Sequence, residues 1–155
     1  MTGLFIDIVR SRHSCRSYSA NVLTEEQKNL ILEAGALAPS SRNLRPVRLF
    51  RIDDIKTIRA LASCRSNGSA KALNSAVFAV AVAADKTISD VWIEDASIAS
   101  AYMQMEAEDL GLGSCWIQIR LRTNDDTSAE EYVRNIISLS ENLSVESIIA
   151  FGIKE

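Results

Sequence analysis

Ala76-Val77-Phe78-Ala79-Val80-Ala81-Val82-Ala83-Ala84 is an unbroken apolar run near the middle of a chain of 155 residues. A strand with one face in water alternates apolar and polar residues, whereas a strand covered on both faces is apolar throughout. The run therefore predicts a central strand covered on both faces. It is far shorter than the roughly 20 apolar residues that span a membrane.

Helix and strand patterns precede this run. Thr24-Glu25-Glu26-Gln27 predicts a capping box at the start of a helix that Pro39 ends. Residues 47–52 alternate apolar and basic side chains, as a half-exposed strand does. Asp53 or Asp54 is placed to cap the next helix.

Helices and strands also alternate after the run. The longest helix is expected to start at Ser89 or Asp90 and to run to about Leu110, with Gly111 as its C-cap. A strand, an amphipathic helix and a strand are then expected at residues 114–119, 126–138 and 145–153. Residues 4–9 are short and apolar, so periodicity leaves both strand and helix open. This alternation predicts an α/β or mixed α+β fold.

Composition narrows the class of protein. A net charge of −3 argues against general nucleic-acid binding, which needs a basic surface. Three cysteines without close spacing and the lack of a signal-peptide pattern favour the reducing cytoplasm. A single histidine argues against a histidine-based zinc site. We therefore expect one domain, residues 1–155, in the cytoplasm, with no metal and neither nucleic acid nor membrane as a partner.

Two basic, hydroxyl-rich loops are the candidate binding elements. In Ser11-Arg12-His13-Ser14-Cys15-Arg16, two guanidiniums bracket a serine, which suits a phosphate or another multi-oxygen anion. Taken alone, these six residues are more simply a solvated basic loop. Pro39-Ser40-Ser41-Arg42-Asn43-Leu44-Arg45-Pro46 is a second such loop between a helix and a predicted strand. Two loops of this kind on an acidic protein suggest one shared anionic ligand.

The middle of the longest predicted helix, residues 96–101, is nearly free of charge and made mostly of small side chains. A helix in a subunit interface and a core helix of a monomer both fit this pattern. The acidic residues of the same helix are interpreted as solvated faces: Glu94, Asp95, Glu106, Glu108 and Asp109. Arg59 is interpreted as an exposed arginine.

Three segments occur in one order across nearly the whole chain. Arg12-His13-Ser14-Cys15-Arg16-Ser17-Tyr18 is similar to a family start of the form Arg-Arg-Ser-x-Arg-x-Tyr/Phe. Ala38-Pro39-Ser40-Ser41-Arg42-Asn43-Leu44-Arg45-Pro46 is similar to Ala-Pro-Ser-x-x-Asn-x-Gln-Pro-Trp. Glu108-Asp109-Leu110-Gly111-Leu112-Gly113-Ser114-Cys115-Trp116-Ile117 is similar to Glu-Leu-Gly-Leu-Gly-Ser-Cys-Trp. Together they resemble the FMN-dependent nitroreductase family, which implies an α+β fold with a central, mostly antiparallel sheet flanked by helices.

The resemblance also implies an intertwined homodimer with one FMN in each of two interfacial sites. Contacts from one subunit are implied for Arg12, His13, Ser14, Arg16, Lys71, Trp116, Ile117 and Gln118. Contacts from the other subunit are implied for Pro39, Ser40, Ser41 and Asn43. Arg12, Ser14 and Arg16 would face the phosphate, ribityl chain or pyrimidine edge, and His13 would act through its backbone.

The sequence departs from the family pattern in three places. Arg45 stands where the family usually has glutamine, and Val47 where it usually has tryptophan. Family members usually continue past the last strand and supply a basic residue to the flavin phosphate, whereas this sequence stops at Glu155, leaving Lys154 as a partial substitute. These departures predict an altered substrate pocket and altered FMN affinity.

The implied function is that of an FMN-dependent NAD(P)H oxidoreductase. A hydride from NADH or NADPH would reach the flavin and pass, in a ping-pong cycle, to an electron-poor small molecule such as a nitroaromatic or quinone. No catalytic side chain is expected because the flavin carries the chemistry. The alternative is a non-catalytic flavin-binding or flavin-sequestering protein.

Overall fold

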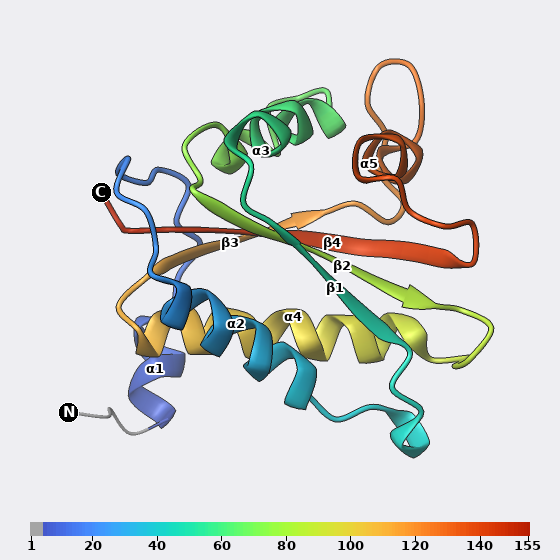
Figure 1. Cartoon of the computed structure of the whole chain (residues 1–155), viewed down its shortest axis with the longest axis horizontal. Coiled ribbons are helices and arrows are strands. Elements are labelled where there is room, and N and C mark those ends of the chain that lie inside the picture. The colour runs from blue at the N-terminus through green and yellow to red at the C-terminus, as the bar shows by residue number, and fades with distance from the viewer. Residues whose placement is uncertain (1–4) are drawn as a thin grey trace.

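The computed structural model describes residues 5–155 and contains one four-stranded sheet. Figure 1 shows that this sheet is twisted and has helices on both faces. The strands lie in the order β1 (Val47–Ile52), β2 (Phe78–Asp85), β4 (Leu143–Gly152) and β3 (Gly113–Gln118). Every neighbouring pair is antiparallel. The α+β class and the antiparallel sheet are thereby confirmed.

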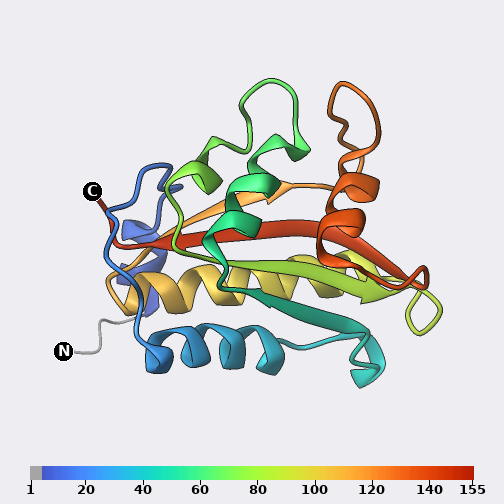
Figure 2. The same cartoon turned by 45° about the horizontal axis from the view of Figure 1, so that its top comes forward.

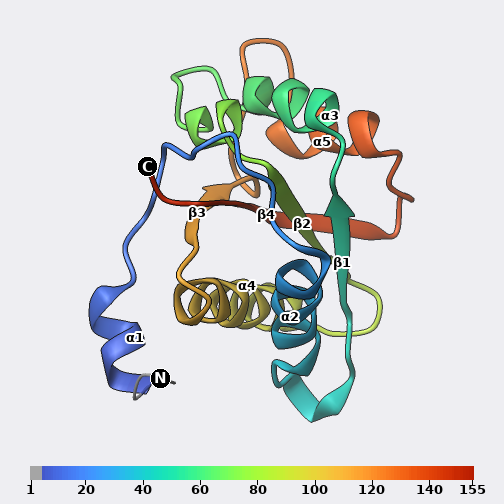
Figure 3. The same cartoon turned by 60° about the vertical axis from the view of Figure 1, so that its left-hand side comes forward.

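The α-helices form two layers. They are α1 (Phe5–Ser11), α2 (Glu25–Leu37), α3 (Ile55–Leu61), α4 (Trp92–Asp109) and α5 (Ala129–Ile137). Short 3₁₀ turns lie at η1 (Ser41–Asn43), η2 (Ala62–Cys64) and η3 (Lys71–Asn74). Figures 2 and 3 show α2 and α4 on one face of the sheet and α3 and α5 on the other. Within residues 5–155, no helix is long and apolar enough to cross a membrane.

The central strand β2 feeds both layers of the core. Phe78, Val80 and Val82 pack toward α2 and α4, whereas the intervening alanines pack toward α3 and α5. Residues 78–84 are all fully buried. Burying one valine or phenylalanine side chain contributes about 1.5–3 kcal/mol. The apolar run therefore predicts the buried strand correctly, because both faces of that strand are covered.

Local signals in the sequence set the starts of two helices. The predicted capping box is present, since the Gln27 N–H donates to Thr24 Oγ1 (3.1 Å) and the Thr24 N–H donates to Gln27 Oε1 (2.9 Å). Asp54, rather than Asp53, caps α3 by accepting the Thr57 N–H at 2.9 Å. The bonds to Thr24 Oγ1 and to Asp54 satisfy N–H groups that the first helical turn leaves without partners.

The long helix α4 begins at Trp92, two to three residues later than predicted. The Ser89 hydroxyl does not cap the helix, and it donates a hydrogen bond to the Asp95 carboxylate at 3.0 Å. At the other end Gly111 has φ of 72°, and the Leu112 N–H donates to the Ala107 carbonyl at 2.8 Å. This is the left-handed glycine termination that the sequence predicts.

The N-terminal segment resolves the ambiguity of residues 4–9 in favour of helix, with Leu4 outside the described residues. In α1, Phe5, Ile6 and Val9 are exposed, and no residue of the helix is buried. The helix lies beside α4 (Figure 3).

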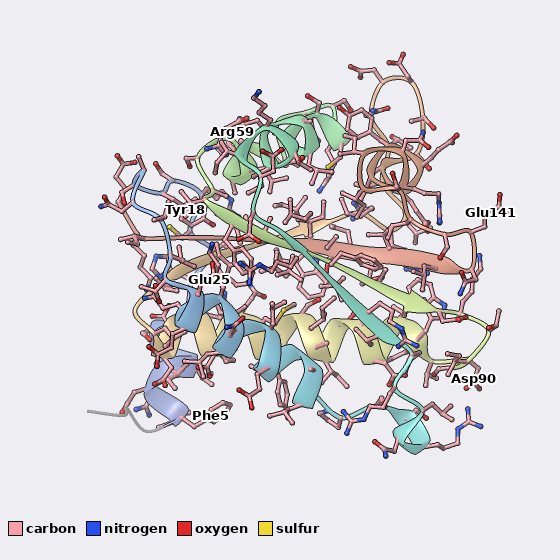
Figure 4. All side chains as sticks on the ribbon, viewed as in Figure 1. Phe5, Tyr18, Glu25, Arg59, Asp90 and Glu141 are labelled. Atoms are coloured by element: carbon pink, nitrogen blue, oxygen red, sulfur yellow. The ribbon has the colours of Figure 1, made fainter. Side chains whose placement is uncertain are left out.

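The chain between α1 and α2 lies across the ends of β3 and β4. The Cys15 N–H donates to the Ser114 carbonyl at 2.9 Å, next to a parallel bridge between Ser14 and Ser114. Tyr18, labelled in Figure 4, is buried, and its hydroxyl donates to the Cys15 carbonyl at 2.6 Å. A Cβ on Gly152 would lie 2.6 Å from the Tyr18 Cβ. The tyrosine therefore fits only because position 152 carries no side chain.

We predict that Gly152→Ala lowers the free energy of unfolding by about 1–3 kcal/mol, the usual cost of overpacking a core. Urea denaturation of the variant measures this loss. In a Tyr18→Ala background the same substitution should cost much less, because the side chain that it meets has been removed. An equal cost in both backgrounds would show that the contact with Tyr18 is not the cause.

Candidate functional site

Strand β3 is an edge strand whose outer side offers unpaired main-chain groups. In an antiparallel pair of strands, the main-chain N–H and C=O groups of one residue point to the partner strand and those of the next residue point away from it. The Ser114 carbonyl faces away from β4, because it accepts the Cys15 N–H. Trp116 and Gln118 follow at intervals of two, so their N–H and C=O groups also point to this free edge. The site therefore begins with a row of main-chain donors and acceptors.

The basic loop of residues 12–16 docks at one end of this edge. Arg12 and Ser14 are half-buried, and His13 and Arg16 are exposed. Among residues 5–155 no ion pair includes Arg12 or Arg16, and the Arg16 guanidinium makes only a long contact (3.4 Å) with the Ser14 carbonyl. The structure thus brings the first and third motifs together and leaves the guanidiniums of Arg12 and Arg16 without a carboxylate partner among the described residues.

This donor set fits the FMN that the sequence implies. Two guanidiniums without carboxylate partners and one hydroxyl suit a phosphate monoester. The free edge of β3 supplies N–H and C=O groups of the kind that pair with a pyrimidine ring. The loop that carries the guanidiniums and the hydroxyl adjoins the strand that carries the amide groups, so one ligand can contact both.

Two predicted contact residues are placed differently from the others. Lys71 is exposed at the start of η3, and just after η3 the Ser75 hydroxyl accepts the Tyr18 N–H at 3.1 Å. Lys71 therefore belongs to the same end of the molecule as the 12–18 segment. Ile117 is fully buried and is paired with Ile148 of β4, so neither its side chain nor its main chain faces the free edge.

The second motif lies at the opposite end of α4. The Ser41 N–H donates to Asp95 in the first turn of α4 (2.8 Å), whereas β3 and the docked loop follow the last turn. A helix of 18 residues is about 27 Å long at 1.5 Å per residue. Figure 1 shows η1 at the lower right and the 12–18 segment at the left. One chain therefore does not bring Pro39, Ser40, Ser41 and Asn43 to its own first motif.

Asp95 corrects one expectation, because it is 3% exposed and not on a solvated face. Its carboxylate accepts both the Ser41 amide and the Ser89 hydroxyl. Buried carboxylates need such partners. Asp95 therefore holds the second motif in place, a role that sequence reasoning missed because it depends on a contact 54 residues apart.

Arg45, which replaces the family's usual glutamine, serves the local structure. Its guanidinium donates to the carbonyls of Ala36 (3.1 Å) and Ala38 (2.9 Å) and to the Asn43 side chain (2.7 Å). These bonds satisfy carbonyls at the C-terminal end of α2, where the helix dipole favours a cation.

A half-open hollow of about 370 Å³ adjoins the second motif. Its lining includes Leu32, Gly35, Ala36, Ala38, Pro39, Ser40, Arg45, Val47, Arg48, Leu49, Asp95 and Ala99. Most of these side chains are apolar, and Val47 leaves room that a tryptophan would fill. The hollow suits a small apolar molecule.

Two other acidic residues of α4, Glu106 and Glu108, are also half-buried rather than solvated. Burial raises the pKa of Glu106, reinforced by the nearby Asp109 and Glu33 charges. Burial also acts on Glu108, but the hydrogen bond and the charge of Lys154, together with the nearby Ser11 hydroxyl, outweigh it and lower its pKa. Lys154 is therefore engaged with Glu108 at 2.8 Å.

Arg59 also differs from its interpretation as a simple exposed cation. Its guanidinium donates to the carbonyls of Leu73 (2.5 Å) and Ala76 (2.8 Å), so it fixes the chain that enters β2 (Figure 4).

Glu146 is a buried acid that the sequence reasoning passed over. It is 4% exposed within β4, and burial raises its pKa. The signal was present, since Glu146 is the one charged residue among residues 143–152.

Comparison with known proteins agrees with the fold and with the resemblance to the nitroreductase family. The model of the Nitroreductase family matches residues 9–83 and 61–153. A solved structure of an FMN-dependent nitroreductase from Clostridium difficile R20291 is 41% identical, with a TM-score of 0.94 over 97% of this chain and 87% of that one. A Desulfovibrio desulfuricans protein solved in complex with FMN is 25% identical, with a TM-score of 0.80 over 99% of this chain and 88% of that one.

A curated relative points the same way. The Archaeoglobus fulgidus protein named "Putative NADH dehydrogenase/NAD(P)H nitroreductase" is 28% identical over 151 residues, which are 95% of this chain and 83% of the relative. The family model spans nearly all of the described chain. The chain belongs to the nitroreductase family.

Proposed function

We propose that this protein is an FMN-dependent NAD(P)H oxidoreductase that works as a homodimer and reduces an electron-poor small molecule by a ping-pong mechanism. The observation that carries the proposal is the docking of the Arg12–Arg16 loop onto the free edge of β3, where neither guanidinium has a carboxylate partner within residues 5–155. The names of two relatives support it, since one is called FMN-dependent and another is solved with FMN. The NAD(P)H donor rests on the name of the curated relative.

Bound FMN would accept a hydride from NADH or NADPH and yield it to the acceptor. The chain's own residues would bind the flavin and tune it. Arg12, Ser14 and Arg16 would hold the phosphate and the polar edge of the ring, and positive charge there favours the anionic reduced flavin. Trp116 and Gln118 would add main-chain hydrogen bonds from the free edge of β3. No side chain of the site is required as a nucleophile.

A second copy of the chain would complete the site. The two motifs lie at opposite ends of α4, so a two-fold dimer can bring the second motif of one subunit to the first motif of its partner. An apolar surface supports this arrangement: Phe5, Ile98 and Tyr102 are exposed, and a groove of about 420 Å³ runs between α1, α2 and α4. Exposed apolar patches of this kind mark interfaces.

The acceptor would occupy the hollow beside the second motif. Its apolar lining suits a nitroaromatic or quinone, and the positive charge of Arg48, one of the lining residues, suits acceptors with a partial or full negative charge.

We predict that the purified protein carries or takes up FMN and that anaerobic NADH or NADPH bleaches the bound flavin. Chromatography of the cofactor released by denaturation identifies it, and the absorbance near the flavin maximum follows the reduction. Recovery of FAD, or failure to take up FMN at all, would contradict the cofactor assignment. A flavin that binds but resists both nucleotides would indicate a flavin carrier instead of a reductase.

Arg16→Ala should weaken FMN binding by roughly 1.5–3 kcal/mol, the range for hydrogen bonds to a charged group. This corresponds to about a tenfold or larger rise in Kd, measurable by quenching of flavin fluorescence. Arg16→Lys should restore only part of the affinity, because an ammonium lacks the planar fork. Lys56→Ala removes one exposed cation from α3 and serves as the control. Equal affinities for the Arg16→Ala and Lys56→Ala variants would reduce the first motif to a solvated loop.

The dimer predicts a solution mass of twice the chain mass of 17.0 kDa, measured by light scattering in the presence of FMN. Tyr102→Glu, which places a charge on the exposed apolar surface of α4, should shift the protein toward the monomer and weaken FMN binding in parallel. A monomer that binds FMN as tightly as the unaltered protein would exclude the shared site.

A further inference from the structure

A β-bulge turns Glu146 onto the same face of the sheet as Trp116. Along β2, Val82 pairs with Ser147 but Ala83 pairs with Val145, so Glu146 is the extra residue of β4. Val145 and Ile148 both pack toward α3 and α5, while Ser147 contacts Ser100 of α4. Regular alternation would send Glu146 into the α3/α5 core. The bulge instead aims it toward α4 and β3, and bulges commonly redirect side chains next to binding sites.

Two successive hydrogen bonds link the Glu146 carboxyl, through the Gln118 side chain, to the indole of Trp116 on the edge strand β3. An indole N–H only donates, so the Gln118 oxygen must face it, and the Trp116 Nε1 to Gln118 Oε1 distance is 2.9 Å. The two hydrogens of the Gln118 amide nitrogen then meet two acceptors. These are the Arg120 carbonyl (3.1 Å) and Glu146 Oε1 (3.3 Å). The amide oxygen and both amide hydrogens of the Gln118 side chain are thus hydrogen-bonded. Its orientation depends on an acceptor at position 146.

The other oxygen of the same carboxyl group has no protein partner. Glu146 Oε2 is buried and makes no hydrogen bond within residues 5–155. The charged groups that face the carboxyl are Arg120, in the loop after β3, and Glu94, on α4. Burial is the largest influence on this group and outweighs the arginine and Gln118, so the pKa of Glu146 lies above its ordinary value.

We infer that Glu146 is a positioning residue that acts through Gln118 to fix the indole of Trp116 on the α4 side of the edge strand β3, and that gain or loss of its proton changes the surroundings of that indole. Oε1 accepts from Gln118 in either protonation state, and the charge arises on a group two hydrogen bonds away from the ring. Any effect of this positioning on FMN binding rests on the proposed function. The coupling between Glu146 and Trp116 does not, because it requires no cofactor.

Tryptophan fluorescence of the full chain tests the coupling without cofactor. The sequence has two tryptophans, so Trp92→Phe leaves Trp116 as the single reporter. Its emission should shift across a titration whose midpoint lies above the ordinary pKa of glutamate. Adding Glu146→Gln, which keeps the shape and an acceptor oxygen, should abolish the shift while leaving the circular dichroism unchanged. Gln118→Leu should also abolish it, because the link is cut.

Glu106→Gln is the matched control, since Glu106 is a second carboxyl whose pKa is raised by burial and lies on α4, outside this chain of hydrogen bonds. The shift should survive in this variant. A shift that persists in Glu146→Gln, or that disappears in Glu106→Gln, would overturn the inference.

Stability provides a second measurement. A raised folded-state pKa means that the folded protein keeps this proton at pH values where the unfolded chain has lost it, so the free energy of unfolding falls as pH rises through that window. Glu146→Gln should remove this part of the fall, and an unchanged pH profile would contradict the assignment.

FMN titration separates the two proposals. A coupled Trp116 in a protein that binds no FMN would refute the proposed function and leave the positioning role intact. Normal FMN binding without any coupling would refute the positioning role alone. When both hold, Gln118→Leu should raise the Kd for FMN severalfold.

Discussion

Burial of the sheet on both faces is the constraint on which the rest of the structure depends. Strands β2 and β4 are enclosed between two helical layers. Their main-chain groups are hydrogen-bonded to neighbouring strands, and their side chains are buried in the core. Any polar recognition by the sheet must use an edge strand. The 12–18 segment covers the first residues of β3 and leaves the later ones open. The fold therefore creates a short stretch of polar edge beside an arginine-rich loop.

Lys28 and Arg51 differ from Arg12 and Arg16 in their partners. Lys28 and Arg51 are paired with Glu25 and Asp53 and lie over the ring of Phe78, so the acids are satisfied and the apolar surface is covered. Hydrogen bonds from Arg51 and Lys28 lower the pKa of Glu25, as a structural ion pair does. Arg12 and Arg16 have no such acid among the described residues, although the chain is acidic overall. In the proposed function, Arg12 and Arg16 would bind the FMN, whereas Lys28 and Arg51 stabilise the fold.

Sequence reasoning succeeded where the determining contacts are local. The capping box at Thr24 spans four residues, and the buried strand β2 is signalled by its own composition. The motifs predicted the family, and only the fold shows that the first and third motifs meet at β3 while the second lies at the far end of α4. The burial of Asp95 and Glu146 was not predicted, because that of Asp95 depends on a contact with a loop and that of Glu146 on a bulge. Neither feature has a periodic signature, and an acid on a helix or in a strand is ordinarily solvated.

The placement of the two motifs at opposite ends of α4 has a genetic consequence. Each site of the proposed dimer draws one half from each chain. When a chain defective in residues 12–16 pairs with a chain defective in residues 39–43, both lesions fall in one site and the other site receives two sound halves. Two alleles that are each inactive would therefore complement one another, and about half of the sites in the mixed dimers would function.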